Sequence, residues 1–386
     1  MKNIFIILTV ILLIGCSNNN IIHNRNVDNW DNPISTPHFG VNKNIAVPFI
    51  QNLEQPPFKK YCFVTTPHPQ KSWGDIYYGD EFNEPIYKFT DGMSPVICGD
   101  WIFAIYINSY DAYEFPISTS IIRYNIKTDN IEILEQPKTD PCWNYIMPSM
   151  NGNMYICASI NFSLIGDIKI VHNGNTIFSE NGSYLFPTLS SDGTTAGWCY
   201  DDTPNSYGNR HAQLYNIDLD TIQTIHTTNN ETECQYINLS ADGNTAVYTV
   251  VIAEWNGHGY TCQDQELWQY KNKNNNKINI LDYRWVESPQ LSNDGNLIIF
   301  SANKDVFEYR GYNILCNNGI ETFEVIDYNV NKQYLWCDIT NDGWIIWCKE
   351  IIDWSNYTLH CTNINGEDYG EIINLNNIIR DAKFIN

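Results

Sequence analysis

Three pairs of neighbouring acidic residues are the first candidates for chemistry in this sequence. They are Asp201 with Asp202, Asp264 with Glu266, and Glu367 with Asp368. Two carboxyl groups that converge on one bond can act as general acid and general base, as in glycoside hydrolysis. In an acidic chain, such neighbours are more often solvated loop charges. We therefore predict no catalytic residue, with a glycan-processing enzyme that uses loop carboxylates as the alternative.

Nucleophilic and metal chemistry have less support. The sequence contains no Gly-x-Ser-x-Gly segment, the turn that exposes the serine of α/β-hydrolases. Residues 190–198 come close to the Ser-x-Asp-x-Gly-x-x-Trp turn of sialidases, but no residue separates Asp192 from Gly193. There is no Cys-x-x-Cys pair and the eight histidines are scattered. We therefore predict no metal site and no cofactor.

Aromatic and polar residues gather in segments that we expect to be loops. The candidate binding residues are Trp73, Asp201, Asp202, Tyr207, Arg210, Trp255, His258 and Trp354. Exposed Trp, Tyr and Arg side chains often dominate binding energies, and such a set suits a protein loop or a glycan. The other interpretation is that the aromatic side chains pack over the edges of the strands.

A repeated turn indicates the elements that would position these loops. Leu189-Ser190-Ser191-Asp192-Gly193 recurs around Asp242 and Gly243, around Asp294 and Gly295, more weakly around Asp342 and Gly343, and most weakly at Gly152. The five glycines are 41, 50, 52 and 48 residues apart along the chain. Asp-Gly favours a two-residue hairpin turn, and the run that follows each turn is apolar on both faces. A hairpin pair repeated at this period predicts a β-propeller.

We therefore expect an all-β fold, a propeller of seven four-stranded antiparallel blades, with six blades as the alternative. Residues 61–66, 74–78 and 85–90 read as the second, third and fourth strands of the first blade. No inner strand precedes them, whereas residues 378–385 form a strand-like run without a hairpin partner. The C-terminal strand should therefore close the ring and remove its free edges. The loops between second and third strands should all lie on the face opposite the Asp-Gly turns.

The Leu-Ser-x-Asp-Gly turn, with a hairpin such as residues 266–270 behind it, resembles the TolB-like propeller repeat. The resemblance covers roughly residues 90–386 and implies the fold more than a function. Tricorn-type and prolyl-oligopeptidase-type propellers, which are similar, place their nucleophile in an added hydrolase domain. TolB itself has a separate α/β domain before its propeller, which this sequence does not match.

The cysteines look structural. Apart from Cys16 there are eleven, and Cys157, Cys199 and Cys348 stand five or six residues after their turn glycines. Equivalent positions in different blades point into different layers and cannot reach one another. We predict buried thiols that act as small hydrophobic groups, not disulfides.

The first residues indicate export. One lysine precedes an apolar run from Ile4 to Ile14 that is too short to span a bilayer comfortably. Residues 13–16, Leu-Ile-Gly-Cys, resemble the bacterial lipoprotein box, which implies lipidation of Cys16; an ordinary signal peptide is the other interpretation. We expect residues 1–15 to be the signal peptide, 16–57 an Asn-rich tether and 58–386 the propeller, anchored in the bacterial cell envelope.

The net charge restricts the classes of binding partner that we expect. The net charge is −22 and no basic run is present, so nucleic acid and anionic lipid surfaces are disfavoured. We expect a monomer that touches the membrane through its lipid anchor only and binds an envelope protein or a glycan without catalysis.

Overall fold

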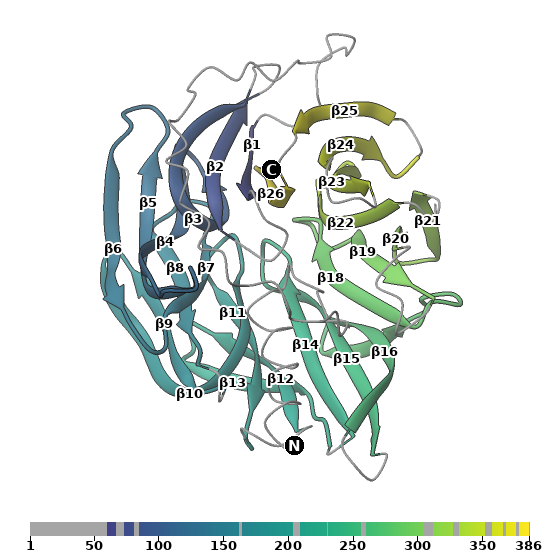
Figure 1. Ribbon diagram of the computed structural model, residues 1–386. Helices are drawn as coiled ribbons and strands as arrows, with labels where there is room; N and C mark the ends of the chain where they lie inside the picture. Colours follow the sequence, from purple (N-terminus) through teal and green to yellow (C-terminus); the bar gives the residue numbers. More distant parts are fainter. Residues whose placement is uncertain are drawn as a thin grey trace, which may run out of the picture.

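The computed structural model describes residues 60–66, 73–80, 85–161, 164–203, 209–229, 231–255, 260–304, 312–326, 332–351, 357–365, 368–375 and 378–385. In these residues the chain forms 26 β-strands and no helix, and hence no helix that could cross a membrane. The strands are arranged radially around a centre (Figure 1). The prediction of an all-β propeller is confirmed. The expected signal peptide and tether lie outside the described residues.

Antiparallel pairing divides the strands into seven units of four, which we number as blades. Blades 1 and 2 are built from β26 (Ile378–Ile385), β1 (Lys60–Thr66), β2 (Gly74–Asp80), β3 (Ile86–Cys98), β4 (Trp101–Tyr110), β5 (Pro116–Asn125) and β6 (Ile131–Lys138). Blades 3 and 4 are built from β7 (Trp143–Pro148), β8 (Met154–Ser159), β9 (Gly166–His172), β10 (Asn175–Leu189), β11 (Thr195–Asp201), β12 (Arg210–Asn216) and β13 (Thr221–His226).

The last three blades have no shared strand. Blade 5 contains β14 (Thr232–Leu239), β15 (Thr245–Trp255), β16 (Tyr260–Lys271) and β17 (Asn274–Ile278). Blade 6 contains β18 (Trp285–Leu291), β19 (Ile298–Asn303), β20 (Asn313–Asn317) and β21 (Thr322–Ile326). Blade 7 contains β22 (Lys332–Ile339), β23 (Trp344–Ile351), β24 (Tyr357–Asn363) and β25 (Asp368–Leu375).

Two long strands connect the early blades. The first part of β3 pairs with β2 as the outer strand of blade 1, and its last part pairs with β4 as the inner strand of blade 2. β10 connects blades 3 and 4 in the same way, pairing first with β9 and then with β11. The chain thus passes from the rim of one blade to the centre of the next without a loop.

The C-terminal strand closes the ring, as the sequence predicts. β26 pairs antiparallel with β1, with Tyr61 opposite Phe384 and Thr66 opposite Ile378. In Figure 1 the C-terminus accordingly lies beside β1 and between the first and last blades. The inner strand of blade 1 therefore comes from the end of the chain, and its other three strands come from the first described residues.

Separate hydrophobic clusters lie between successive blades. Between blades 3 and 4, for example, Met154 and Ile156 belong to the same buried cluster as Trp198 and Tyr215. Similar clusters lie between blades 4 and 5 and between blades 5 and 6. Strands covered on both faces explain why the run after each turn is apolar throughout.

The prediction that the cysteines are buried is confirmed for most of those in the described residues. Of the ten cysteines whose burial the structure describes, eight are buried. Burial raises the pKa of Cys199 to about 12, and burial also raises the pKa of Cys262 to about 12. These thiols are therefore protonated at neutral pH and act as apolar packing groups, since the thiolate is the reactive form.

Candidate functional site

The Asp-Gly turns are longer than the sequence predicts. Between Ser190 and Thr195, which share a backbone hydrogen bond of 2.9 Å, the loop contains four residues. Ser190 Oγ donates to Asp192 Oδ1 at 2.7 Å and accepts from the Thr195 N–H at 3.0 Å. Only Gly193 has a positive φ, of 77°. The expected two-residue turn is therefore wrong, because these side chains hold a four-residue loop in which glycine alone takes the left-handed conformation.

The same geometry repeats around the ring and joins the blades. Ser240 and Ser292 donate to Asp242 and Asp294 at 2.7 and 2.6 Å, and Thr340 donates to Asp342 at 2.6 Å. The Asp192 N–H donates to Ala241 O in the next turn, and the Ala241 N–H to Asn293 O in the one after. The face that carries these turns, the Asp-Gly face, is therefore occupied by structural contacts.

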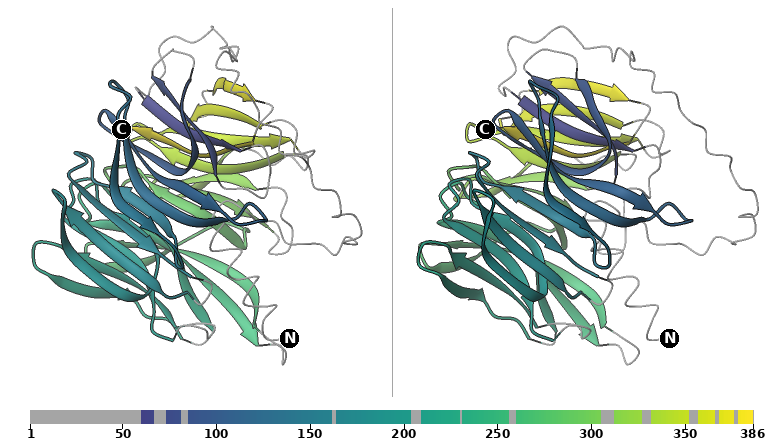
Figure 2. Two further views of the ribbon diagram at one scale, coloured as in Figure 1. Left: turned by 60° about the vertical axis from the view of Figure 1, so that its left-hand side comes forward. Right: turned by 90° about the vertical axis from the view of Figure 1, so that its left-hand side faces the viewer.

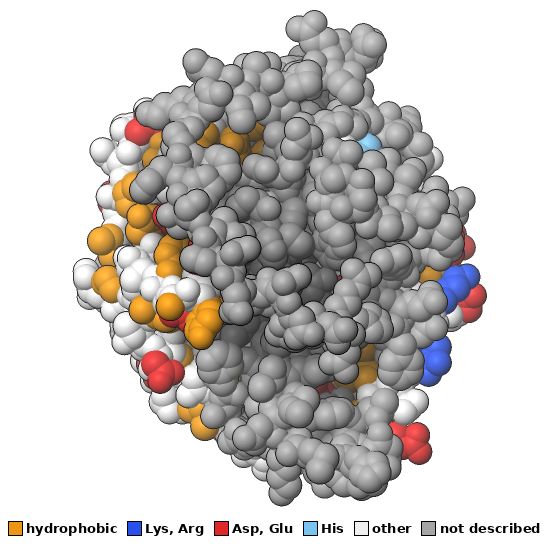
Figure 3. Space-filling model, in the orientation of Figure 1, with side chains coloured by type: hydrophobic (Ala, Val, Ile, Leu, Met, Phe, Trp, Pro, Cys, Tyr) orange, Lys and Arg blue, Asp and Glu red, His pale blue; other side chains and the backbone are white. Residues whose placement is uncertain are grey.

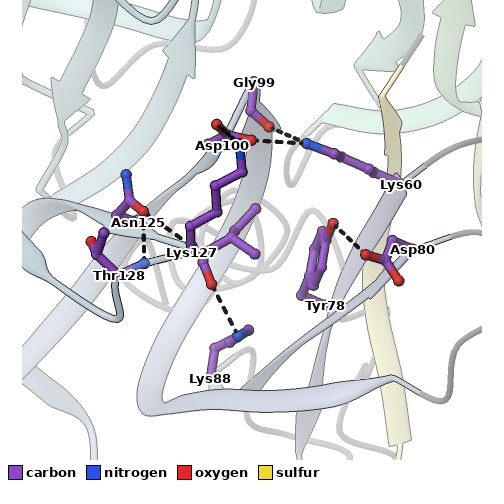
Figure 4. Close-up of polar contacts among 10 residues, drawn as sticks. Lys60, Tyr78, Asp80, Lys88, Gly99, Asp100, Asn125, Lys127 and Thr128 are labelled. Carbon is purple, nitrogen blue, oxygen red and sulfur yellow. Dashed lines mark hydrogen bonds and ion pairs between the residues drawn. The ribbon is translucent and has the colours of Figure 1, made fainter.

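In blade 2, different residues join the corresponding turn to blade 1 (Figure 4). Gly99 and Asp100 form a two-residue turn between the paired residues Cys98 and Trp101. Lys60 Nζ donates to Gly99 O at 2.9 Å and lies 3.2 Å from Asp100 Oδ1, and Lys127 Nζ lies 2.6 Å from Asp100 Oδ2. Hydrogen bonds from Lys127 and then Lys60 hold the pKa of the Asp100 carboxyl below its usual range. These contacts tie β1 to the turn of blade 2.

We call the opposite face, which carries the connection between β4 and β5, the loop face. The predicted binding residues are only partly described. Tyr207, His258 and Trp354 lie outside the described residues, and Trp255 ends β15 with its side chain outside them. Trp73 is buried and its ring centroid lies 6.0 Å from that of Tyr110. The expectation of an exposed side chain is thus wrong for Trp73, which packs against the neighbouring blade.

The exposure expected of Arg210 is also wrong. Arg210 is the first residue of β12 and forms a parallel bridge with Glu233 of β14, so blades 4 and 5 meet there. Its Nη1 lies 3.3 Å from Glu233 Oε1, and the two side chains are 2% and 4% exposed. Gln235 Nε2 donates to the same Glu233 oxygen at 2.6 Å. Arg210 therefore links two blades and does not present its guanidinium to solvent.

The equivalent residues in other blades serve the same purpose. In blade 2, Thr119 Oγ1 donates to Trp143 O of blade 3 at 2.8 Å. In blade 5, Gln265 Oε1 accepts from the Val286 N–H of blade 6 at 2.7 Å. Each is a buried polar residue in the third strand of its blade that bonds to the inner strand of the next blade. This position is a repeated connection between blades.

Asp201 and Asp202, although adjacent, do not converge. Asp201 is the last residue of β11 and is 2% exposed, whereas Asp202 is exposed and lies 3.4 Å from His211 Nε2. Neighbouring residues at a strand end point to opposite sides. Burial raises the pKa of the Asp201 carboxyl, although nearby Arg210 lowers it. The two carboxyl groups therefore cannot act on one bond as a pair.

The predicted binding residues do not include an exposed aromatic turn on the loop face, residues 111–117, which we call the aromatic tip. The connection between β4 and β5 carries Tyr113 and Phe115, which are 82% and 58% exposed, and Ile117 follows at 46%. In the right-hand view of Figure 2 this blue hairpin projects to the right, away from the Asp-Gly turns. In the space-filling view, exposed hydrophobic side chains gather on the side where β5 and β6 lie (Figure 3). The signal in the sequence is two aromatic residues within Asp-Ala-Tyr-Glu-Phe between two apolar strands.

Comparison with models of known protein families finds no match, and comparison with curated proteins finds none either. Solved structures do match. An acylaminoacyl peptidase from Pyrococcus horikoshii superimposes with a TM-score of 0.57 and 12% identity, over 82% of this chain and 50% of that chain. The β-propeller domain of the Trilobed protease from Pyrococcus furiosus gives a TM-score of 0.50 and 9% identity, over 70% of this chain and 82% of that domain.

These similarities establish the propeller fold and nothing finer. The chain spans about half the length of the acylaminoacyl peptidases that it matches. A TolB from Acinetobacter baumannii also matches, with a TM-score of 0.47 and 11% identity, over 84% of this chain and 66% of that chain. A match at that level carries no role across, since function resides in sites and not in the fold.

Proposed function

We propose that this chain is a non-catalytic binding module of the bacterial cell envelope. In this proposal residues 1–15 direct export, a lipid on Cys16 anchors the protein, residues 16–57 are a tether, and residues 58–386 form the propeller. The module acts as a monomer and binds a protein or a glycan through the loop face. The observation that carries the binding role is the exposed aromatic tip on that face, at Tyr113 and Phe115.

The contrast between the two faces supports this choice. The turn side chains of the Asp-Gly face bond within and between blades. The large exposed hydrophobic residues described there, such as Met150, Leu219 at 70% and Ile320 at 92%, are not aromatic and come from separate turns. On the loop face two aromatic rings project from a single hairpin. Exposed Tyr and Phe on one element are typical of binding surfaces.

The described carboxylates support binding over catalysis. Asp264 Oδ1 accepts from the Gln265 N–H at 3.0 Å. Glu266 accepts from Trp268 Nε1 at 2.8 Å and pairs with Lys277 at 2.6 Å. Asp264 and Glu266 therefore make structural contacts. The side chains of Asp201 and Asp202 point apart, so neither of these two predicted pairs is arranged for catalysis.

The experiment compares the two faces with matched variants. The purified chain is incubated with isolated cell-envelope material, and the bound fraction is measured by sedimentation. Tyr113→Ala combined with Phe115→Ala should reduce binding at least tenfold, because truncating such residues typically costs about 2 kcal/mol or more. Leu219→Ala combined with Ile320→Ala, on the Asp-Gly face, should leave binding unchanged. Equal binding by all variants would contradict the proposed face, and release of sugar fragments during incubation would favour the enzyme alternative.

A further inference from the structure

Hydrogen bonds within the aromatic tip, residues 111–117, define its turn without a ligand. Asp111 Oδ1 accepts the backbone N–H groups of Tyr113 and Phe115, both at 2.8 Å. The Asp111 N–H donates to Phe115 O at 2.9 Å, and the Glu114 N–H to Asp111 O at 3.1 Å. Glu114 has a φ of 62°, which completes the turn. A ligand that binds here does not have to order the loop, so more of its contact energy appears as affinity.

The charges around the tip limit the class of ligand. Residues 101–122, which contain β4, the tip and most of β5, include no Lys or Arg, and Arg123, further along β5, is paired with Glu132. Asp111 and Glu114 lie in the tip, and Asp91 accepts the hydroxyl of Tyr110 at its base, at 2.5 Å. An anionic ligand would be repelled by these carboxylates and by the net charge of −22. A ligand rich in neutral hydroxyl groups carries no charge for these carboxylates to repel and can donate hydrogen bonds to their remaining acceptor sites.

The small area of the tip favours a glycan over a protein as its ligand. A stable protein interface covers about 800 Å² on each partner, far more than one seven-residue turn presents. A sugar ring needs an aromatic face and a few polar neighbours. Tyr113 and Phe115 provide the rings, and Glu114 stands between them in the sequence. The tip therefore fits a small neutral ligand better than it fits a macromolecular surface.

We infer that the aromatic tip is a binding site for a neutral glycan, with sugar rings on Tyr113 and Phe115 and hydroxyl groups directed to the acidic side chains. This inference rests on the proposed function and names the ligand class for the loop face. Asp111 is a positioning residue, because its carboxylate holds the turn that presents the two rings.

The test measures binding of defined oligosaccharides by calorimetry. The neutral probes are maltoheptaose, cellohexaose and hexa-N-acetylchitohexaose, and the acidic probe is hexagalacturonate. At least one neutral probe should bind, and the acidic probe should bind at least tenfold more weakly. Tyr113→Ala and Phe115→Ala should each weaken the neutral probe at least tenfold, whereas Tyr113→Phe, which keeps the ring, should change its affinity less than threefold. Leu219→Ala is the control on the Asp-Gly face and should have no effect.

Each remaining outcome overturns the inference in a distinct way. If no neutral probe binds but the Tyr113 and Phe115 variants still lose binding to envelope material, the proposed function stands and the ligand is a protein. If hexagalacturonate binds best, the charge argument fails. If a neutral probe binds equally to every variant, the site lies elsewhere.

Asp111→Ala tests the positioning role. This variant should bind the neutral probe more weakly while its melting temperature stays within about two degrees of the parent protein, since only the turn is released.

Discussion

At the scale of single residues, the Arg210–Glu233 ion pair connects blades 4 and 5 almost without solvent contact. Removing one member of a buried pair leaves an uncompensated charge, which typically costs about 3–5 kcal/mol. Glu233→Ala should therefore lower the free energy of unfolding by about that amount, measured by chemical denaturation. Replacing both residues, as Arg210→Met with Glu233→Leu, should cost much less.

The matched control for this prediction is the ion pair of Lys277 with Glu266, whose side chains are 54% and 21% exposed. Solvent-exposed pairs contribute at most about 1 kcal/mol. Lys277→Ala should thus leave the free energy of unfolding nearly unchanged. A loss below 1 kcal/mol for Glu233→Ala would mean that water or another side chain compensates the charge of Arg210.

Asp201, next to this pair, should oppose folding at neutral pH. Its Oδ2 is buried with no hydrogen-bond partner among the described residues, and burial raises its pKa in the folded protein. A carboxyl with a raised folded pKa favours folding below its unfolded value, near 3.9, and loses that contribution as the pH rises through the folded value. Asp201→Asn should therefore raise the free energy of unfolding at pH 7, with a smaller gain at pH 4. A stability loss at pH 7 would show that the carboxylate is held by a favourable contact.

At the scale of elements, β26 decides whether the ring is closed. Deleting residues 378–386 would leave β1 as an unpaired edge and open the packing between the first and last blades. We expect a loss of several kcal/mol and a melting temperature lower by at least about five degrees, measured by calorimetry. Ala382→Asp, at a buried position in β26, should act in the same direction. A truncated protein that melts within a degree or two of the intact chain would show that closure contributes little.

The elements that repeat could be predicted from sequence, and those fixed by a distant partner could not. The turn around Gly193 and the apolar strand after it are local, so their period reveals the blades. The length of the turn depends on the hydrogen bonds that the Ser190 hydroxyl makes with Asp192 and Thr195. The preference of Asp-Gly for two-residue turns does not take these bonds into account. Arg210 looks like a loop residue in Tyr-Gly-Asn-Arg-His, and its burial depends on Glu233 in the next blade.

The candidate site shows the same division. The loop that carries Tyr113 and Phe115 was expected on the loop face, because strand order alone places it there. Which of its side chains are exposed depends on the bonds of Asp111 and could not be read from composition. Trp73, the candidate tryptophan whose side chain the structure describes, is buried against Tyr110 instead.

At the scale of the whole molecule, the proposal requires attachment to a membrane by Cys16 alone. Cys16→Ser should move the protein from the membrane fraction to the soluble fraction, or leave the precursor uncleaved, because no other residue would carry the lipid. Fractionation and intact-mass measurement distinguish these results. A variant that matures normally and remains with the membrane would refute the anchor.

Pairing of β1 with β26 also determines when the first blade can be completed during synthesis of the chain. Lys60 pairs with Ile385, so the first blade lacks its inner strand until residues 378–385 have been synthesised. A chain released early by the ribosome therefore keeps an open strand edge, however many later blades it has formed, and such edges invite aggregation. Premature termination should consequently yield insoluble fragments instead of smaller propellers.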